Sequence, residues 1–418
     1  MAGLAAIIFG CIFLQRLAVP VGAIQLSLSF LIGYGGLAYL LLRGRIALSF
    51  PLCIFFFVVM AALTMSILHS GSSASLMSFF YLFSIYSLYL FKIRGDGQAA
   101  SEEIQNLYQR FMLIAAAGGI IQFCLQFVLP FELLFPLETF VPAQFLFGEV
   151  YNVIIPLTYG SPIIKSNGFI FLEPSFFSQF LALAFILELM GRQRASRLAL
   201  LAGGLLVAYS GTGLLLIALF LPYLMLRRGN LYLLLFAIGG LIILGFSATA
   251  LNLDIFLGRV GEFNSPESSG FARFVSPFYL FRDFMGTPGA FLLGLGPGSI
   301  DEVMREASYR GYISHDPTWI KAVLEYGVIA GLLLLGYVVA AFFAGSRSKV
   351  LSAVLLCLFL FLGGYLLNPI MHFLFAALLA WSNAETAAVQ ATRARSPAPA
   401  GIGAGAVQPA RRDSLRLP

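Results

Sequence analysis

Glu173 is the first residue whose position suits chemistry, because it directly precedes Pro174 at the start of a long apolar stretch. Proline is favoured at the first position of a helix, where its missing N–H costs nothing. The pair therefore predicts a helix that begins at Pro174, with Glu173 as its N-cap. A carboxylate at such a helix start could also accept a proton or position a sugar hydroxyl. The plain helix start and the catalytic carboxylate both remain open at this stage.

A second acid–proline pair has a histidine beside it, in the sequence Ser-His-Asp-Pro-Thr-Trp at 314–319. The pattern predicts a helix that begins at Pro317 and is capped by Asp316, with His315 just outside its N-terminus. Histidine can exchange a proton near neutral pH. Among the three histidines, His315 is the one that lies beside a carboxylate after a long polar segment. We therefore predict a functional role for His315.

Basic residues that suit an anionic group flank these two motifs. Arginine binds phosphate oxygens through two hydrogen bonds and keeps its charge at any physiological pH. Arg273 is the main candidate for binding a phosphate or diphosphate group, and Arg259, Arg282 and Lys165 are further candidates. Ion pairs with the many acids of the same loop are the alternative for each arginine.

Ser210 and Thr212 interrupt an apolar stretch that lies between basic residues at 192–197 and at 227–228. Both basic groups are expected on one side of a membrane, yet the stretch is too short for two ordinary spans and too long for one. Two short helices that meet deep in the protein satisfy this, because protein or a water-filled cavity must surround irregular backbone at that depth. Such breaks often lie beside a binding site, which makes both residues candidate substrate contacts. A hairpin turn near the outer surface satisfies the same constraint.

These polar residues are set in a strongly apolar chain. Of its 418 residues, 60% are hydrophobic and 11% are charged, whereas soluble domains carry about 25% charged residues. The apolar residues recur in blocks of membrane-spanning length, which predicts an all-α polytopic membrane protein and excludes a soluble enzyme. The net charge is +6, and the basic residues are scattered over short loops. No nucleic acid is therefore expected as a partner.

About 12 transmembrane helices (11–12) are expected in one domain, residues 1–386. The predicted spans are 2–14, 22–42, 50–68, 76–91, 107–129, 174–190, 198–209, 213–226, 231–250, 318–344, 350–367 and 370–382. Two long outer segments, about 130–173 and 251–317, interrupt them, and segments of that length usually carry function. Residues 387–418 are rich in Ala, Pro, Gly and Arg and are predicted to form a disordered tail.

The distribution of charge predicts the orientation. Seventeen of the 25 Lys and Arg residues fall on alternate loops and the tail, and these loops have a net charge of +11, against −5 for the remaining loops. By the positive-inside rule, the basic side is the cytoplasm. Both termini are then cytoplasmic, and Glu173, Arg273 and His315 lie at the outer face.

No motif for a nucleotide, a metal or a cofactor is evident. The Gly-Leu-Gly-Pro-Gly sequence at 294–298 follows no strand of a βαβ unit and precedes no phosphate-loop lysine. It is therefore predicted to be a loop with tight turns. No metal and no cofactor is expected.

Four segments in a fixed order carry a family resemblance: G-F-I-F-L-E-P-S at 168–175, S-G-T-G at 210–213, G-L-G-P-G at 294–298, and S-H-D-P-T-W with E-Y-G-x-x-x-G at 314–331. With about a dozen spans and a large outer loop late in the chain, they resemble the Wzy-type polysaccharide polymerases and the related O-antigen ligases. The resemblance covers roughly residues 100–380. The Glu-Pro-Ser segment favours an exopolysaccharide polymerase.

The resemblance implies the fold of the C-type glycosyltransferases and O-antigen ligases, with a large periplasmic loop, and a metal-independent glycosyltransferase activity. It implies an oligosaccharide linked to undecaprenyl diphosphate as the substrate, at the periplasmic face of the bacterial inner membrane. The growing chain would be transferred to a new repeat unit, and undecaprenyl diphosphate would leave. Membrane lipid, a flippase and a chain-length regulator (co-polymerase) are the implied partners.

The resemblance also assigns roles to residues. Arg273 falls where the family has an arginine early in the large outer loop, and His315 falls where it has the histidine before the next span. Asp316 stands where asparagine is more common. We expect Arg273 to bind diphosphate, and His315 to act as the base or as a second diphosphate contact, with Glu173 as another candidate base. The further candidate substrate contacts are Lys165, Arg259, Arg282, Asp316, Ser210 and Thr212.

Two other functions are compatible with the sequence. An O-antigen ligase would use the same fold and site to transfer the glycan to another acceptor. A transporter or flippase of lipid-linked sugars would place charged residues inside the spans. Nearly all ionisable residues of this chain lie at the ends of the predicted spans. The sequence therefore favours the polymerase.

Overall fold

The computed structural model describes residues 2–21, 24–71, 74–94, 97–147, 151–158, 160–228, 264–266, 268–344, 346 and 348–381. The protein is mostly helical. Among the described residues, three helical stretches are long and apolar enough to cross a membrane, namely Phe50–Ser70, Ala99–Leu125 and Thr318–Phe343, and shorter apolar helices accompany them. The predicted span 231–250, Arg259 and the predicted tail 387–418 lie outside the described residues.

In the first third of the chain, the described residues form five α-helices and two short antiparallel strand pairs. The helices are α1 (Ala2–Phe13), α2 (Leu28–Leu42), α3 (Phe50–Ser70), α4 (Leu76–Ser87) and α5 (Gly97–Leu125), with a 3-10 turn η2 (Leu88–Leu90) after α4. The strands are β1 (Ala18–Val21), β2 (Ile24–Ser27), β3 (Ile46–Leu48) and β4 (Phe91–Ile93). The strand pairs are additions to the predicted all-α fold.

In the middle of the chain, the described residues form three short helical elements and three longer helices. The short elements are α6 (Phe131–Leu134), α7 (Pro136–Phe140) and η3 (Ala143–Phe145), and the longer helices are α8 (Pro174–Met190), α9 (Ala195–Ala208) and α10 (Gly211–Arg228). The prediction that a helix begins at Pro174 is confirmed. Helices α9 and α10 both pack on α8, and α9 also packs on α5.

The last part of the chain begins with four short helices, followed by a long one. The elements are α13 (Ser269–Phe274), α14 (Ser276–Phe284), α15 (Pro288–Leu293), α16 (Ile300–Tyr309), α17 (Thr318–Phe343), α18 (Lys349–Phe361), α19 (Pro369–Phe375) and a π turn η5 (Ala376–Ala380). Helix α17 packs on α3 and α18, and α19 packs on α1 and α2.

Two predicted helix starts are wrong. Helix α5 begins at Gly97, ten residues before the predicted span 107–129, because its first turns are polar and helical structure extends beyond the apolar block. Helix α2 begins at Leu28, because the preceding residues of the predicted span 22–42 form β2 instead. Apolarity predicts burial in lipid or protein, and it does not by itself predict where helical hydrogen bonding starts.

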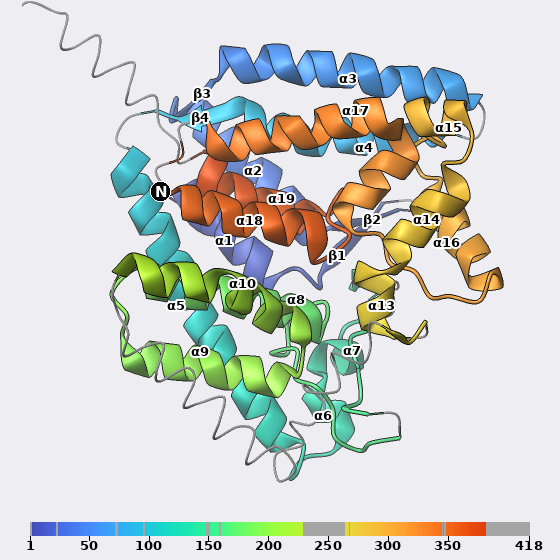
Figure 1. The fold of residues 1–418 in the computed structure, drawn as a ribbon. Helices are drawn as coiled ribbons and strands as arrows, with labels where there is room; N and C mark the ends of the chain where they lie inside the picture. The colour runs from blue at the N-terminus through green and yellow to red at the C-terminus, as the bar shows by residue number, and fades with distance from the viewer. Residues whose placement is uncertain are drawn as a thin grey trace, which may run out of the picture.

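Basic connecting segments gather at one end of the molecule. Strand β3 follows Arg43 and pairs with β4, which contains Lys92. The Arg94 N–H donates to the Arg45 carbonyl at 2.7 Å, and the Ile93 N–H donates to the carbonyl of Trp381, after the last described helix, at 2.8 Å. Figure 1 shows β3, β4 and the N-terminus at this end, and α13 to α16 at the opposite end. The polar outer segments are therefore separated from these basic loops along the helix direction.

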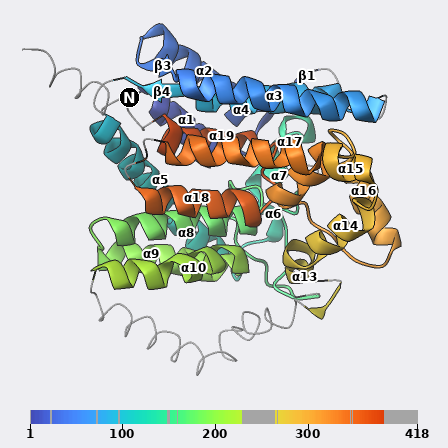
Figure 2. The same cartoon turned by 45° about the horizontal axis from the view of Figure 1, so that its top comes forward.

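The large outer segment is anchored where α17 is interrupted. Gly327 has φ 76° and ψ 171°, which breaks the helix, and the carbonyls just before it are free to accept hydrogen bonds from elsewhere. The Leu295 N–H donates to the Leu324 carbonyl at 2.8 Å, and the Gly296 N–H donates to the Glu325 carbonyl at 2.9 Å. In Figure 2, α15 lies against this end of α17. The predicted loop of tight turns at 294–298 is thus confirmed, and it docks onto α17.

We predict that Gly294→Ala strongly destabilises the protein. Gly294 has φ +83°, and a Cβ there would overlap the backbone N of Gly327 and the carbonyl of Glu325. The combined strain and overlap should cost about 3 kcal/mol. The measurement is the thermal unfolding temperature of the purified protein in detergent.

Gly311→Ala is the matched control, because Gly311 also has a positive φ of +88° but has open space around its Cα. It should lose only the backbone term, about 1 kcal/mol. Equal unfolding temperatures for the two variants would show that the docking contact does not matter for stability.

Candidate functional site

Glu173 lies at the start of α8 but does not cap it through its side chain. Its backbone is extended, with φ −148° and ψ 160°, as in an N-cap. Its carboxylate instead accepts hydrogen bonds from the Asn152 N–H at 3.1 Å and from the Ser175 hydroxyl at 2.8 Å. Glu173 therefore ties the segment before α8 to the N-terminal end of that helix.

Asp316 is not the cap of the following helix, and the predicted capping role is wrong. Pro317 is extended, with φ −47° and ψ 145°, so that α17 begins one residue later, at Thr318. The Asp316 carboxylate accepts a hydrogen bond from Lys321 Nζ at 3.3 Å, and both side chains are largely buried. The aspartate therefore forms an ion pair with the first turn of α17.

Arg273 and His315 are brought together by the backbone. Arg273 lies in α13. The His315 N–H donates to the carbonyl of Ala272, the residue before Arg273, at 3.0 Å. The charge of Arg273 acts directly on the His315 ring. Two residues that are 42 positions apart in the sequence thus share one small region.

The connection between α18 and α19 forms a further side of this region. The Thr318 hydroxyl donates to the Gly363 carbonyl at 3.2 Å and accepts from the Tyr365 N–H at 3.0 Å. A Cβ on Gly364 would lie 2.6 Å from Asp316 Oδ1, so that only glycine allows the carboxylate to approach this closely. The charges of Arg273 and Glu173 both act on the Tyr365 hydroxyl.

Several residues of this region were not predicted from the sequence. Tyr151 accepts a hydrogen bond from Asn368 Nδ2 at 3.3 Å, while the Asn368 carbonyl oxygen caps α19 through the Met371 N–H at 3.1 Å. Lys321 is the partner of Asp316. Tyrosines are frequent in this chain, and nothing in the local sequence separates these from structural ones. The one available signal was the i to i+5 spacing of Asp316 and Lys321 across a helix start.

The surroundings of His315 favour its neutral form. Crowding by protein atoms is the main cause that lowers the pKa of His315 to about 4, the charge of Arg273 acts in the same direction, and Asp316 opposes both. The residue nevertheless remains exposed, so water screens part of these effects, and the direction of the shift is the firm result. At pH 7 the imidazole is uncharged and can accept a proton.

The pKa of the Tyr151 phenol moves in the other direction. Burial is the main cause that raises the pKa of Tyr151 to about 12, the hydrogen bond from Asn368 opposes it, and the charges of Glu173 and Asp316 raise it further. Both carboxylates therefore act on the Tyr151 hydroxyl. Glu173, Asp316, Arg273 and His315 form one group. We call it the outer polar cluster, after the outer face at which the sequence predicts these residues to lie.

Arg282 is turned to a different partner. Its Nε donates to Asp283 Oδ1 at 2.7 Å, and its guanidinium lies 4.8 Å above the Tyr279 ring. The bond with Arg282 is the largest cause that lowers the pKa of Asp283. The Tyr312 hydroxyl also donates to Asp283, at 3.2 Å. The sequence allowed an ion pair with a nearby acid as the alternative to phosphate binding by Arg282, and Arg282 forms this ion pair. No described contact joins Arg282 to the outer polar cluster.

The remaining predicted contacts lie in two other places. The Lys165 N–H donates to the Ile155 carbonyl at 2.9 Å, and Lys165 borders a small cavity with Gln126. Ser210 and Thr212 are buried at the junction of α9 and α10, where their hydroxyls are 3.1 Å apart and the Ser210 carbonyl accepts from the Ser178 hydroxyl at 3.2 Å. Helices α9 and α10 meet at this turn, as both predicted arrangements allow, and the turn packs against the first turns of α8.

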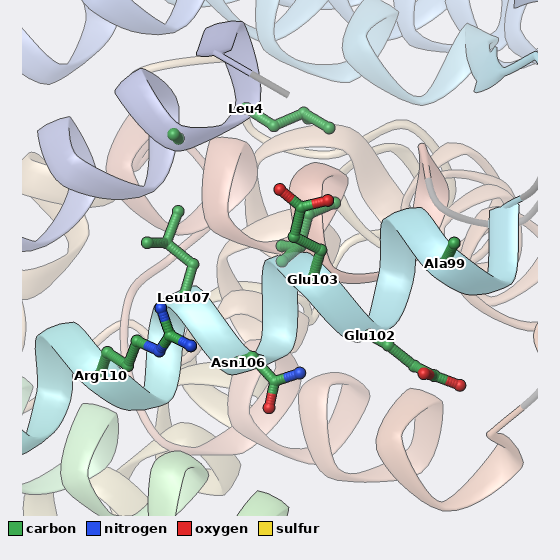
Figure 3. A pocket seen from close by; sticks show the side chains of 9 residues that line it. Leu4, Ala99, Glu102, Glu103, Asn106, Leu107 and Arg110 are labelled. Atoms are coloured by element: carbon green, nitrogen blue, oxygen red, sulfur yellow. The ribbon is translucent and has the colours of Figure 1, made fainter.

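A concave region of about 440 Å³ lies at the other end of the molecule, between α1 and α5 (Figure 3). In this view the Glu103 side chain points towards α1, while Glu102 points away from it. Asn106 and Arg110 also line the region. None of the residues of the outer polar cluster lines this concave region. The candidate site is therefore defined by the polar side chains that come together and not by the volume of a cavity.

No protein-family model matches the chain, and none of the curated proteins is significantly similar to it. The fold and the apolar helices place it in the class of helical, membrane-associated proteins.

We predict that Arg273→Gln raises the pKa of His315. The change removes the charge of Arg273, which is one of the two causes that lower the His315 pKa. The other cause, crowding by protein atoms, remains, so the pKa should stay below the ordinary value of 6.5. An NMR titration of ¹⁵N-histidine in the full chain would measure it. Arg305→Gln, which removes an exposed arginine paired with Glu302 at 3.6 Å, should leave the titration unchanged. An identical His315 pKa in the Arg273 variant would argue against the proximity of the two side chains.

Proposed function

We propose that the protein is a polysaccharide polymerase that extends oligosaccharide repeats linked to undecaprenyl diphosphate, at the periplasmic face of the bacterial inner membrane. The observation that supports it is the convergence of Arg273, His315, Glu173 and Asp316 at one end of a helical, apolar protein. The proposal includes about twelve spans and two cytoplasmic termini.

The proposed reaction joins two lipid-linked saccharides. A hydroxyl oxygen of the acceptor sugar attacks the anomeric carbon of the donor chain, and a new glycosidic C–O bond forms. The bond from that carbon to the diphosphate oxygen breaks, so that undecaprenyl diphosphate leaves with the electron pair. The attacking hydroxyl loses its proton to a base on the protein.

Arg273 suits the leaving group in this reaction. Negative charge develops on the diphosphate as the bond breaks, and a cation already held in place stabilises that charge without reorganisation. A guanidinium also keeps its charge and binds two oxygens at once. A second cation, Lys321, lies nearby in an ion pair with Asp316.

His315 suits the proton transfer. It is exposed, so an acceptor hydroxyl can reach it. It is also uncharged at pH 7, and its lowered pKa makes it a weaker base than a free imidazole. Glu173 is less suitable as the base, because both of its carboxylate oxygens already accept hydrogen bonds. We therefore assign the base role to His315 first, and a second diphosphate contact is its alternative role.

We predict that Arg273→Ala and His315→Ala abolish polymer in cells, while single lipid-linked repeats accumulate. The first change removes the charge that stabilises the leaving group, and the second removes the base. Loss of such a group typically lowers the rate by about 100-fold or more. The measurement is the size distribution of extracted saccharide, at matched protein levels.

Arg305→Ala is the control, because Arg305 is exposed on α16 and pairs only locally with Glu302 in the described part of the chain. Normal polymer from either site variant, at normal protein level, would contradict the assignment. Transfer to a different acceptor in place of elongation would identify a ligase. Elongation by purified protein in detergent would exclude a pure transporter, since no membrane is then crossed.

A further inference from the structure

Three aromatic side chains from distant parts of the chain pack in a row beside the outer polar cluster. The ring centroids of Tyr151 and Phe176 are 5.6 Å apart with an interplanar angle of 90°, and those of Phe176 and Tyr365 are 5.6 Å apart at 79°. Phe176 and Tyr365 are buried, at 6% and 2% exposure, whereas Tyr151 is only partly buried. Tyr151 is therefore the member of this row that solvent and a ligand can reach.

Polar groups with complementary hydrogen-bonding capacity surround the Tyr151 ring. Asn368 Nδ2 donates to the Tyr151 hydroxyl at 3.3 Å. The carboxylates of Glu173 and Asp316 both act on this hydroxyl. Asp316 is 20% exposed and retains room for a further hydrogen bond. The region thus combines a partly exposed tyrosine ring, its phenol and the carboxylate of Asp316 as an acceptor.

This combination matches the chemistry of a neutral sugar ring. A pyranose has an apolar face of C–H groups, which packs on an aromatic ring, and a rim of hydroxyls, which donate to carboxylates. Asp316 is neutralised by Lys321, whereas the described partners of Glu173 are the uncharged donors of Asn152 and Ser175. The Glu173 carboxylate therefore disfavours a phosphate or an acidic sugar beside Tyr151, since like charges at close range are unfavourable. The diphosphate must therefore lie on the Arg273 side of the cluster.

We propose that Tyr151, supported by Asn368, forms a subsite for one uncharged sugar ring of the acceptor. The subsite rests on the proposed function for its biological meaning, but its existence can be tested by binding alone. It predicts that the saccharide which lies next to the attacked bond is neutral and that a uronic acid is rejected at this position.

In this proposal Glu173 is a positioning residue for Tyr151. Its carboxylate accepts a hydrogen bond at 3.1 Å from the N–H of Asn152, the residue that follows Tyr151. Glu173→Gln keeps an oxygen that can accept this hydrogen bond, whereas Glu173→Ala does not. Binding of a sugar should therefore survive the first change and be weakened by the second, although a catalytic base would be lost in both.

The test uses saturation-transfer NMR on the full chain in lipid nanodiscs, which avoids sugar-based detergents. The probes are methyl β-D-glucopyranoside, methyl β-D-galactopyranoside and methyl β-D-glucuronide. We expect at least one neutral glycoside to receive saturation, and the glucuronide to receive much less. Tyr151→Ala should reduce the neutral signal about fivefold, and Tyr151→Phe should reduce it less, because the ring remains.

Two measurements separate this subsite from a loss of folding. Tyr309→Ala, a change at a tyrosine on α16 that is 84% exposed, should leave glycoside binding as in the wild type. Farnesyl diphosphate serves as a probe for the anion, and Tyr151→Ala should still bind it, whereas Arg273→Ala should lose it. A Tyr151 variant that loses both ligands while Tyr309→Ala keeps them would overturn the proposal, since the loss would then be structural.

The outcomes also separate the subsite from the proposed function. Equal glycoside signals from the wild type and Tyr151→Ala, or no signal from any neutral glycoside with the wild type, would refute the subsite even if polymer forms in cells. Equal binding of the glucuronide and the neutral glycosides would refute the stated preference for an uncharged ring. Glycoside binding through Tyr151 without any elongation of lipid-linked repeats would support the subsite and refute the polymerase.

Discussion

The docking of the large outer segment onto the interrupted start of α17 is the contact on which the candidate site depends. A helix interior consumes every carbonyl in its own hydrogen bonds, and a break frees some of them. The left-handed Gly327 frees the carbonyls of Leu324 and Glu325, which accept from Leu295 and Gly296 and, at 2.9 Å, from the Ser66 hydroxyl. Such irregular backbone is stable within an apolar protein only where other protein groups satisfy it. Leu295 and Gly296 come from the segment that carries Arg273 and ends at His315, whereas Ser66 comes from α3, so the break also determines where Arg273 and His315 lie.

The same logic explains why the outer polar cluster contains ion pairs and hydrogen bonds at close range. A chain with few charged residues has few partners available for each of them, and a charge that loses contact with water must be compensated nearby. Asp316 is compensated by Lys321, and Glu173 by two donors from neighbouring segments. Arg273 and His315 are joined through the backbone of their segments. The cluster is thus held by several weak contacts between segments, which leaves individual groups able to exchange partners with a substrate.

Much of the fold could be predicted from the sequence, and particular residues explain the exceptions. Helix α8 begins at Pro174, as the sequence predicts, because a residue without an N–H fits in the first turn of a helix. The same argument is one residue early at Pro317, since the proline there remains extended and Asp316 pairs with Lys321 instead of capping. The first turns of α5, after Gly97, consist of polar residues, so no apolar pattern predicted that the helix begins there. Within the candidate site, Arg273, His315, Glu173 and Asp316 were predicted, while Tyr151, Asn368 and Lys321 were not.

The sequence by itself determined that the chain is apolar and helical, that its basic residues are scattered over short connecting segments, and that a few polar residues precede helix starts. These properties depend on local composition and on the backbone preferences of single residues, which act over a few positions. Only the tertiary structure decided which of the polar residues meet. Arg282 turns to its neighbour Asp283, whereas Tyr151 and Asn368, 217 positions apart, join at one hydrogen bond. Contacts between distant segments depend on how whole helices pack, and packing is set by the summed shape and burial of many side chains.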